Sequence, residues 1–113
     1  AVRSCANPAA EDEPDLSLVT VDLDIFDRLV AGFLDAAGAF LAPAEIEALP
    51  VSAKLMTLEC GMRFLTDHLD GDLYFRIDRP DHNLDRCRTQ FKMVGDFEAK
   101  LGAMERIVER HFA

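Results

Sequence analysis

Three charged residues at helical spacing are the strongest candidates for chemistry in this chain: Glu59, Arg63 and Asp67. Residues four apart share one face of a helix, so each carboxylate lies one turn from the guanidinium. Two flanking carboxylates can hold an arginine in a fixed direction and make it a pre-oriented hydrogen-bond donor to a polar ligand. A row of ion pairs with a purely structural role is the alternative.

Tyr74 is the only tyrosine, and it follows the turn-forming run Asp70-Gly71-Asp72. Its ring could stack on a ligand while its hydroxyl makes one polar contact. Its neighbours are apolar, however, so the residues alone favour an ordinary core aromatic. Both interpretations stay open at this point.

The run from His82 to Gln90 contains two arginines, Arg86 and Arg88. Because they are two residues apart, they face different directions on a helix. The residues favour a structural role, in which the run ties the last helix to the preceding loop. Phosphate binding by either arginine is the alternative.

Metal binding and nucleophilic catalysis find little support. The acids from Glu11 to Glu13, with Asp22 and Asp24, are more typical of solvated faces and helix starts than of a metal site. The three histidines have no local partners for nucleophilic catalysis. No zinc site or disulfide framework is expected, because the cysteines are odd in number and widely spaced, at Cys5, Cys60 and Cys87. Reduced thiols in a cytoplasmic protein fit this pattern best.

Size and charge limit the possible partners. At 113 residues, with 50% hydrophobic and 29% charged residues, the chain has the composition of one globular unit. Its net charge of −9 opposes binding to nucleic acid or to an anionic membrane. The longest largely apolar run, residues 29–44, is interrupted by Asp35 and falls short of the roughly 20 residues of a spanning helix. We therefore expect a soluble protein.

Hydrophobic periodicity predicts four helices: three at about 24–40, 43–49 and 52–69, and a last one that begins between 81 and 83 and runs to about 110. Asp22 or Asp24 can cap the first helix, and Pro43 suits the first turn of the second. Pro50 is expected to end that second helix. Residues 70–72 should stop the third helix, which carries apolar side chains on two faces and is therefore expected to be central.

The sequence leaves the structure of two stretches undecided. Residues 73–77 fit either a short extended piece or a bent helical turn. The last helix contains Gly95 and Gly102, so it is bent or divided into two. Residues 1–20 are expected to form a loop or extended segment packed onto the rest. The class predicted from these patterns is all-α.

Three ordered blocks of the sequence resemble a known family. Residues 53–67, 71–75 and 82–90, with the acidic segment 11–17, are similar to the C-terminal third of bacterial N-acetylhexosamine 1-kinases. These enzymes belong to the aminoglycoside phosphotransferase-like kinases, which share the protein-kinase-like fold. The resemblance implies that residues 1–113 are one helical fragment of the C-terminal, substrate-binding lobe. The N-terminal nucleotide lobe and the catalytic loop would be absent.

The resemblance also implies roles for individual residues. Arg63 and Tyr74 fall at positions that hold the N-acetylhexosamine, Glu59 and Asp67 would orient Arg63, and Arg3 is a weaker candidate for sugar binding. No catalytic residue and no metal ligand can be assigned in this chain. In the full-length enzyme, ATP and magnesium would support transfer of the γ-phosphoryl group to the anomeric hydroxyl. The fragment alone is expected to be inactive.

Two other functions remain open. The chain could belong to a phosphotransferase of the same fold that acts on another small hydroxylated substrate, such as an aminoglycoside, choline or homoserine. It could also be a stand-alone helical interaction module. The expected partners are the sugar, the missing N-terminal part of the same protein and, through exposed apolar surface, a second copy of the fragment. The sequence does not indicate which sugar epimer is preferred.

Overall fold

A computed structural model describes residues 1–112 of the chain. Helices and loops account for this whole range, which contains no strand, so the predicted all-α class is confirmed. The helical elements are α1 (Val2–Cys5), η1 (Leu16–Leu18), α2 (Leu23–Ala37), η2 (Gly38–Phe40), α3 (Pro43–Glu47), α4 (Leu49–Asp70) and α5 (His82–Phe112). None of the helices in this range is long and apolar enough to cross a membrane.

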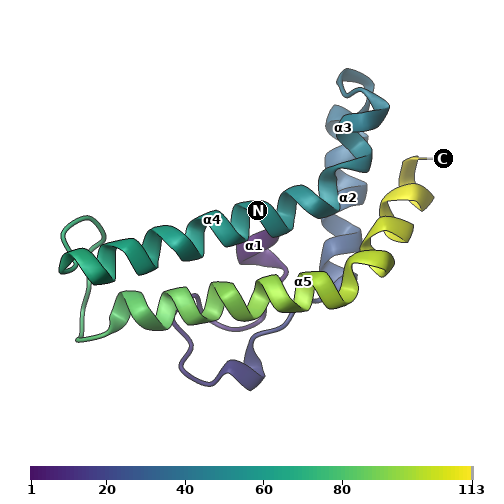
Figure 1. The fold of residues 1–113 in the computed structure, drawn as a ribbon. Coiled ribbons are helices and arrows are strands. Elements are labelled where there is room, and N and C mark those ends of the chain that lie inside the picture. Colours follow the sequence, from purple (N-terminus) through teal and green to yellow (C-terminus); the bar gives the residue numbers. More distant parts are fainter. Residues whose placement is uncertain (113) are drawn as a thin grey trace.

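The two longest helices, α4 and α5, define the shape of the molecule. They lie side by side along its length, and α2 and α3 stand at one end (Figure 1). The principal dimensions are 47 × 27 × 20 Å. The short helix α1 packs against α4 and α2, so the beginning of the described chain lies close to the middle of α4.

Local signals account for most helix boundaries. The side chain of Asp22 accepts hydrogen bonds from the backbone N–H groups of Asp24 and Ile25, which confirms it as the cap of α2. Pro43 occupies the first turn of α3, as predicted. Gly71 ends α4 in the left-handed conformation with φ 98°, which glycine adopts without steric cost.

The prediction for Pro50 was wrong. This proline lies in the first turn of α4, which starts at Leu49 rather than at Ser52. The N–H of Ser52 donates to the carbonyl of Ala48, so the helix already continues through the proline. A proline is as compatible with the start of a helix as with the end of the preceding one, because the missing N–H would have no intrahelical partner there.

The expectation that α4 is covered on two faces was also wrong. Its buried residues, including Thr57, Gly61 and Phe64, lie on one face. On the face expected to be equally buried, Leu58 and Leu65 are half-buried, whereas Leu55, Met62 and Leu69 are exposed at 53%, 54% and 75%. Periodicity shows that a face is apolar, but it does not show that the same chain covers it.

The α5 helix is continuous from His82 to Phe112 and bends in its C-terminal part (Figure 1). Of the two predicted possibilities, one bent helix is therefore confirmed. Its buried residues Met93, Phe97 and Met104 join Phe26 and Val30 of α2 in the core. This cluster also receives two side chains from the segment before α2, Val19 and Val21.

The segment before α2 packs onto α5, as expected, but it is not a loop throughout, because it contains the short helices α1 and η1. The carboxylate of Asp96 accepts a hydrogen bond from the Thr20 hydroxyl at 3.0 Å. Lys92 and Lys100 donate to the carbonyls of Val19 and Val21 at 3.0 and 2.7 Å. The two lysine bonds satisfy backbone carbonyls that have no helix or sheet partner.

Candidate functional site

Arg63 is an exposed residue on α4, and its guanidinium lies over two aromatic rings. The guanidinium carbon is 5.6 Å from the centroid of the Tyr74 ring and 5.4 Å from that of Phe75. Both distances are within the range of cation–π attraction. Among the described residues, Arg63 forms no ion pair with Glu59 or Asp67, so these carboxylates neither orient Arg63, as the resemblance implied, nor form the alternative row of ion pairs.

Asp67 has a different task from the predicted one. Its carboxylate is buried and accepts hydrogen bonds from the backbone N–H groups of Tyr74 at 2.8 Å and Phe75 at 3.0 Å. The side-chain amide of Asn83 donates to the same carboxylate at 2.7 Å. Burial raises the pKa of Asp67, but these hydrogen bonds outweigh that effect and lower the pKa below its ordinary value of 3.8. Asp67 therefore binds the loop after α4 and does not bind Arg63.

Residues 73–77 form a loop without helix or strand, so the bent helical turn, one of the two conformations left open by the sequence, is not formed. Tyr74 in this loop is 75% exposed, so the core role favoured by its apolar neighbours was wrong. Its ring meets Phe75 edge to face, with centroids 4.9 Å apart. Phe75 in turn packs on the buried ring of Phe64 at 4.8 Å. Tyr74 is therefore presented to solvent beside Arg63.

A cleft of about 760 Å³ opens between α1, α2 and α4. Of the predicted site residues it includes Arg3, Glu59 and Arg63, whereas Tyr74 does not line it. Apolar side chains supply most of the wall, among them Phe26, Leu29, Val30, Phe33, Met56 and Cys60. Arg63 thus joins the two parts of the candidate site, because it lines the cleft and also contacts the Tyr74 ring.

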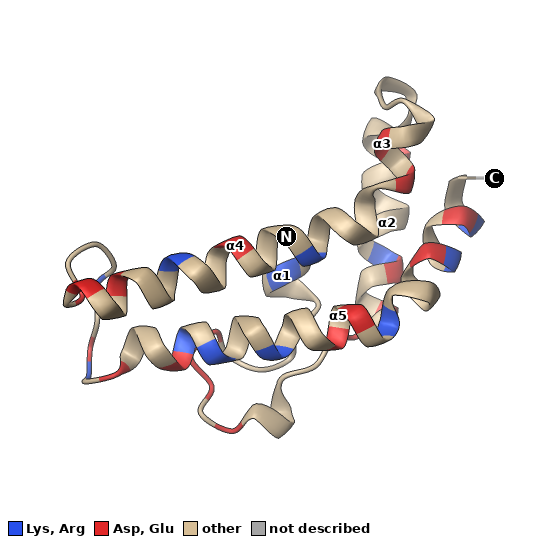
Figure 2. Ribbon diagram, viewed as in Figure 1, with Lys and Arg blue, Asp and Glu red and all other residues tan. Residues whose placement is uncertain are grey.

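The cleft carries more positive than negative charge, although the chain is acidic. Arg3, Arg28 and Arg63 line it, against the single carboxylate of Glu59. Figure 2 shows basic residues on α1, α2 and α4, the helices that form the cleft. Arg3 is held by Glu11 at 2.6 Å and by the Gln90 side chain at 3.2 Å. Within residues 1–112 neither Arg28 nor Arg63 forms an ion pair, which leaves their donors to water or to a ligand.

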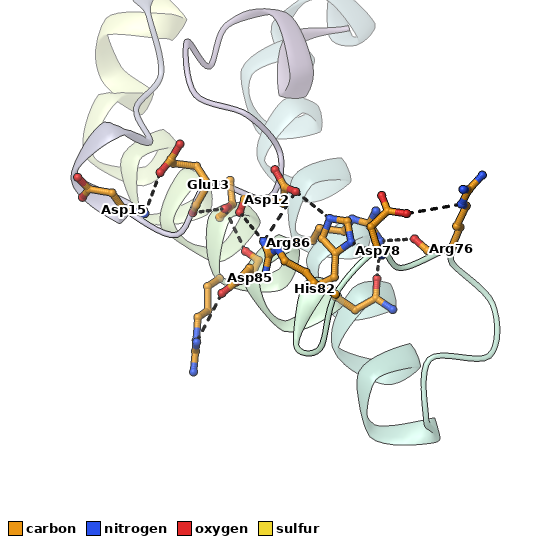
Figure 3. Close-up of polar contacts among 12 residues, drawn as sticks. Asp12, Glu13, Asp15, Arg76, Asp78, His82, Asp85 and Arg86 are labelled. Carbon is orange, nitrogen blue, oxygen red and sulfur yellow. Dashed lines mark hydrogen bonds and ion pairs between the residues drawn. The ribbon is translucent and has the colours of Figure 1, made fainter.

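A second polar cluster lies where the acidic segment meets the start of α5. Figure 3 shows Asp12, His82 and Asp78 in one chain of hydrogen bonds. The backbone N–H of Asp78 donates to Nδ1 of His82, so the ring proton is on Nε2 and is donated to Asp12 at 2.7 Å. The hydrogen bond from His82 lowers the pKa of Asp12, although burial opposes it. This buried histidine is a connector between two segments.

The arginines of residues 82–90 also have structural partners. Arg86 donates to the side chain of Asn83 at 2.9 Å and to the carbonyl of Arg76 at 3.0 Å, and it lies over Phe64. The predicted role of tying the last helix to the preceding loop is confirmed for Arg86. Arg88 is exposed, and its nearest carboxylate is Asp85 at 3.8 Å.

The acidic segment and the cysteines show no metal centre within residues 1–112, where no group of three possible ligands comes together. All three cysteines are free thiols. Burial raises the pKa of Cys60, which lines the cleft, and that of Cys87. Both thiols are therefore poor nucleophiles at neutral pH.

Sequence reasoning missed Phe75 and Asn83 as partners in this site. No local pattern links Asn83 to Asp67, because the end of α4 and the whole loop before α5 separate the two residues in the sequence. Phe75 is one of eight phenylalanines and carries no signal of its own.

No protein-family model matches the chain.

Proposed function

We propose that this chain is the sugar-binding helical part of an ATP-dependent kinase of the aminoglycoside phosphotransferase-like family. The full-length enzyme would transfer the γ-phosphoryl group of ATP to the anomeric hydroxyl of an N-acetylhexosamine. The observation that carries the proposal is the position of Arg63, which lines the cleft together with Arg3 and contacts the ring of Tyr74. These are the three residues to which the sequence resemblance assigns sugar contacts.

The chemistry of the three residues suits a sugar. The planar guanidinium of Arg63 offers several donors to hydroxyl oxygens, and no carboxylate of residues 1–112 competes for them. The exposed ring of Tyr74 offers an apolar face together with one hydroxyl. Arg3 is already held by Glu11 and Gln90, so its direction is set before a ligand arrives.

The phosphoryl-transfer machinery lies elsewhere in the proposed enzyme. ATP and magnesium would be held by the N-terminal lobe and the catalytic loop, and the present chain would position the acceptor. The exposed apolar residues of α4, Leu55, Met62 and Leu69, support contacts with that missing part. Without it, we expect the fragment to associate with itself through the same surface and to phosphorylate nothing.

An acceptor panel tests the proposal. The protein containing this chain and all residues encoded before it would be incubated with ATP, magnesium and one acceptor at a time. We expect phosphorylation of N-acetylglucosamine or N-acetylgalactosamine at the anomeric position. Turnover confined to an aminoglycoside, choline or homoserine would move the protein to another substrate class of the same fold. Absence of turnover with every acceptor would favour a helical interaction module.

A further inference from the structure

One buried carboxylate holds the loop between α4 and α5. Asp67 is 6% exposed and accepts the backbone N–H groups of two consecutive loop residues, Tyr74 and Phe75. Asn83, which is fully buried at the start of α5, donates to Asp67 and also to Asp72 at 3.0 Å. Donors from the loop and from α5 therefore converge on a single side chain of α4.

The anchored backbone sets the direction of an exposed ring. With 75% of Tyr74 exposed, little packing holds its side chain, so its position depends on the backbone that carries it. Asp67 binds that backbone at Tyr74 and at the next residue, whose ring is fixed against Phe64. Hydrogen bonds to an ionised carboxylate are stronger than neutral ones, and burial strengthens them further. The ring of Tyr74 is thereby kept in contact with Arg63.

We propose that Asp67 is a positioning residue, which acts through the backbone of Tyr74 and Phe75 to preform the surface made by the Tyr74 ring and the Arg63 guanidinium. An aromatic residue on a free loop must be ordered when a ligand binds, and that ordering lowers affinity. A ring that is held beforehand avoids this loss. The value of this arrangement for sugar binding rests on the function proposed above, but the positioning itself does not.

The composition of the chain provides a direct test of the positioning. Tyr74 is the only tyrosine and there is no tryptophan, so tyrosine fluorescence reports on this residue alone. In Asp67→Asn, an amide NH2 replaces one of the two acceptor oxygens, so at least one of the backbone bonds is lost. We expect lower fluorescence anisotropy and stronger collisional quenching by acrylamide than in the unchanged chain. The matched control is Asp70→Asn, which removes an exposed carboxylate at the end of the same helix and should change neither quantity.

A second measurement needs no variant and therefore does not depend on how Asp67→Asn folds. The carboxyl carbons of Asp67 and Asp72 and the amide protons of Tyr74 and Phe75 would be followed by NMR during acidification. Asp72 and Arg86 are charged groups that also hydrogen-bond to the Asn83 side chain. Their effect on the amide signals must therefore be separated from that of Asp67. We expect both amide signals to shift with the titration of the Asp67 carboxyl carbon. Amide signals that follow only Asp72, or do not move, would overturn the proposal, as would a folded Asp67→Asn chain with unchanged Tyr74 fluorescence.

Kinetics of the full-length enzyme then separate this inference from the proposed function. If both hold, Asp67→Asn raises the KM for N-acetylhexosamine and leaves the KM for ATP unchanged, because only the acceptor surface loses its order. If Tyr74 fluorescence changes in Asp67→Asn but sugar kinetics do not, the positioning by Asp67 stands and the sugar contact of Tyr74 is wrong.

Discussion

The guanidinium of Arg63 and the ring of Tyr74 are in contact, 5.6 Å apart from carbon to centroid, although one lies on α4 and the other in the loop after it. This contact brings together two residues singled out for independent reasons, a charge at helical spacing and the only tyrosine. It replaces the ion pairs that the spacing of Glu59, Arg63 and Asp67 predicted. The guanidinium is thus held by aromatic faces, and its hydrogen-bond donors stay available.

Arg63→Lys is expected to impair sugar use in the full-length enzyme. Lysine keeps the positive charge but loses the planar group that can bind two acceptors and lie flat over the rings. We expect kcat/KM for the sugar to fall about tenfold, which corresponds to about 1.4 kcal/mol. Steady-state kinetics with Arg106→Lys as control, an exposed arginine of α5 outside the cleft lining, checks the assignment. Equal kinetics in the two variants would leave Arg63 without a role in sugar binding.

Tyr74→Phe removes one hydroxyl and keeps the ring. If the hydroxyl contacts the sugar, kcat/KM should fall by an amount equivalent to about 0.5–1.5 kcal/mol, with the KM for ATP unchanged. Because the residue is 75% exposed, the melting temperature should hardly change. A variant that melts markedly lower but uses the sugar normally would contradict both expectations.

Gly61→Ala should lower stability, because Gly61 of α4 packs directly against side chains of α5. A Cβ atom there would be 2.7 Å from Cε1 of Phe91 and 3.1 Å from Cβ of the buried Gln90. Overpacking costs about 1–3 kcal/mol, which exceeds the gain of up to about 1 kcal/mol in helix propensity. Gly95→Ala is the matched control on α5, because a Cβ atom there meets nothing within 4 Å and the propensity gain should raise stability. Urea unfolding measures the change in the free energy of unfolding of each variant, and we expect the two changes to have opposite signs. A Gly61→Ala chain that is more stable than the unchanged chain would refute the close packing at this position.

Acid should destabilise the fold through Asp96. Burial raises the pKa of this carboxyl, but hydrogen bonds from Lys100, the Val21 N–H and Thr20 outweigh it and lower the pKa below 3.8. The unfolded chain therefore binds the proton more readily than the folded chain, so the stabilisation is fully present above about pH 3.8 and is lost as the pH falls further. As the pH is lowered through this range, the urea concentration at the midpoint of unfolding should fall less steeply for Asp96→Asn than for the unchanged chain. Parallel curves for the two chains would rule out this contribution.

Local sequence signals were sufficient for the existence of the longer helices, but not for the start of α4 or for the short helix α1. The cap at Asp22, the proline at the start of α3 and the stop at Gly71 depend on atoms within one turn of the residue concerned. The same holds for the continuous stripe along α5, whose spacing is visible in the sequence. The all-α class followed from these local interactions, and the structure confirms it.

The hydrogen-bond partners of individual residues and the exposure of their side chains were decided by the tertiary structure. The spacing placed Asp67 beside Arg63, but the reversal of the chain after Gly71 brings the backbone of Tyr74 and the amide of Asn83 to its carboxylate instead. Apolar neighbours suggested that Tyr74 is buried, yet no element of residues 1–112 covers its ring. Helical periodicity describes one helix at a time, whereas a carboxylate binds whichever donors the fold delivers within about 3 Å. Which donors arrive depends on how the loop returns to α4, and the sequence pattern contains no local signal for that path.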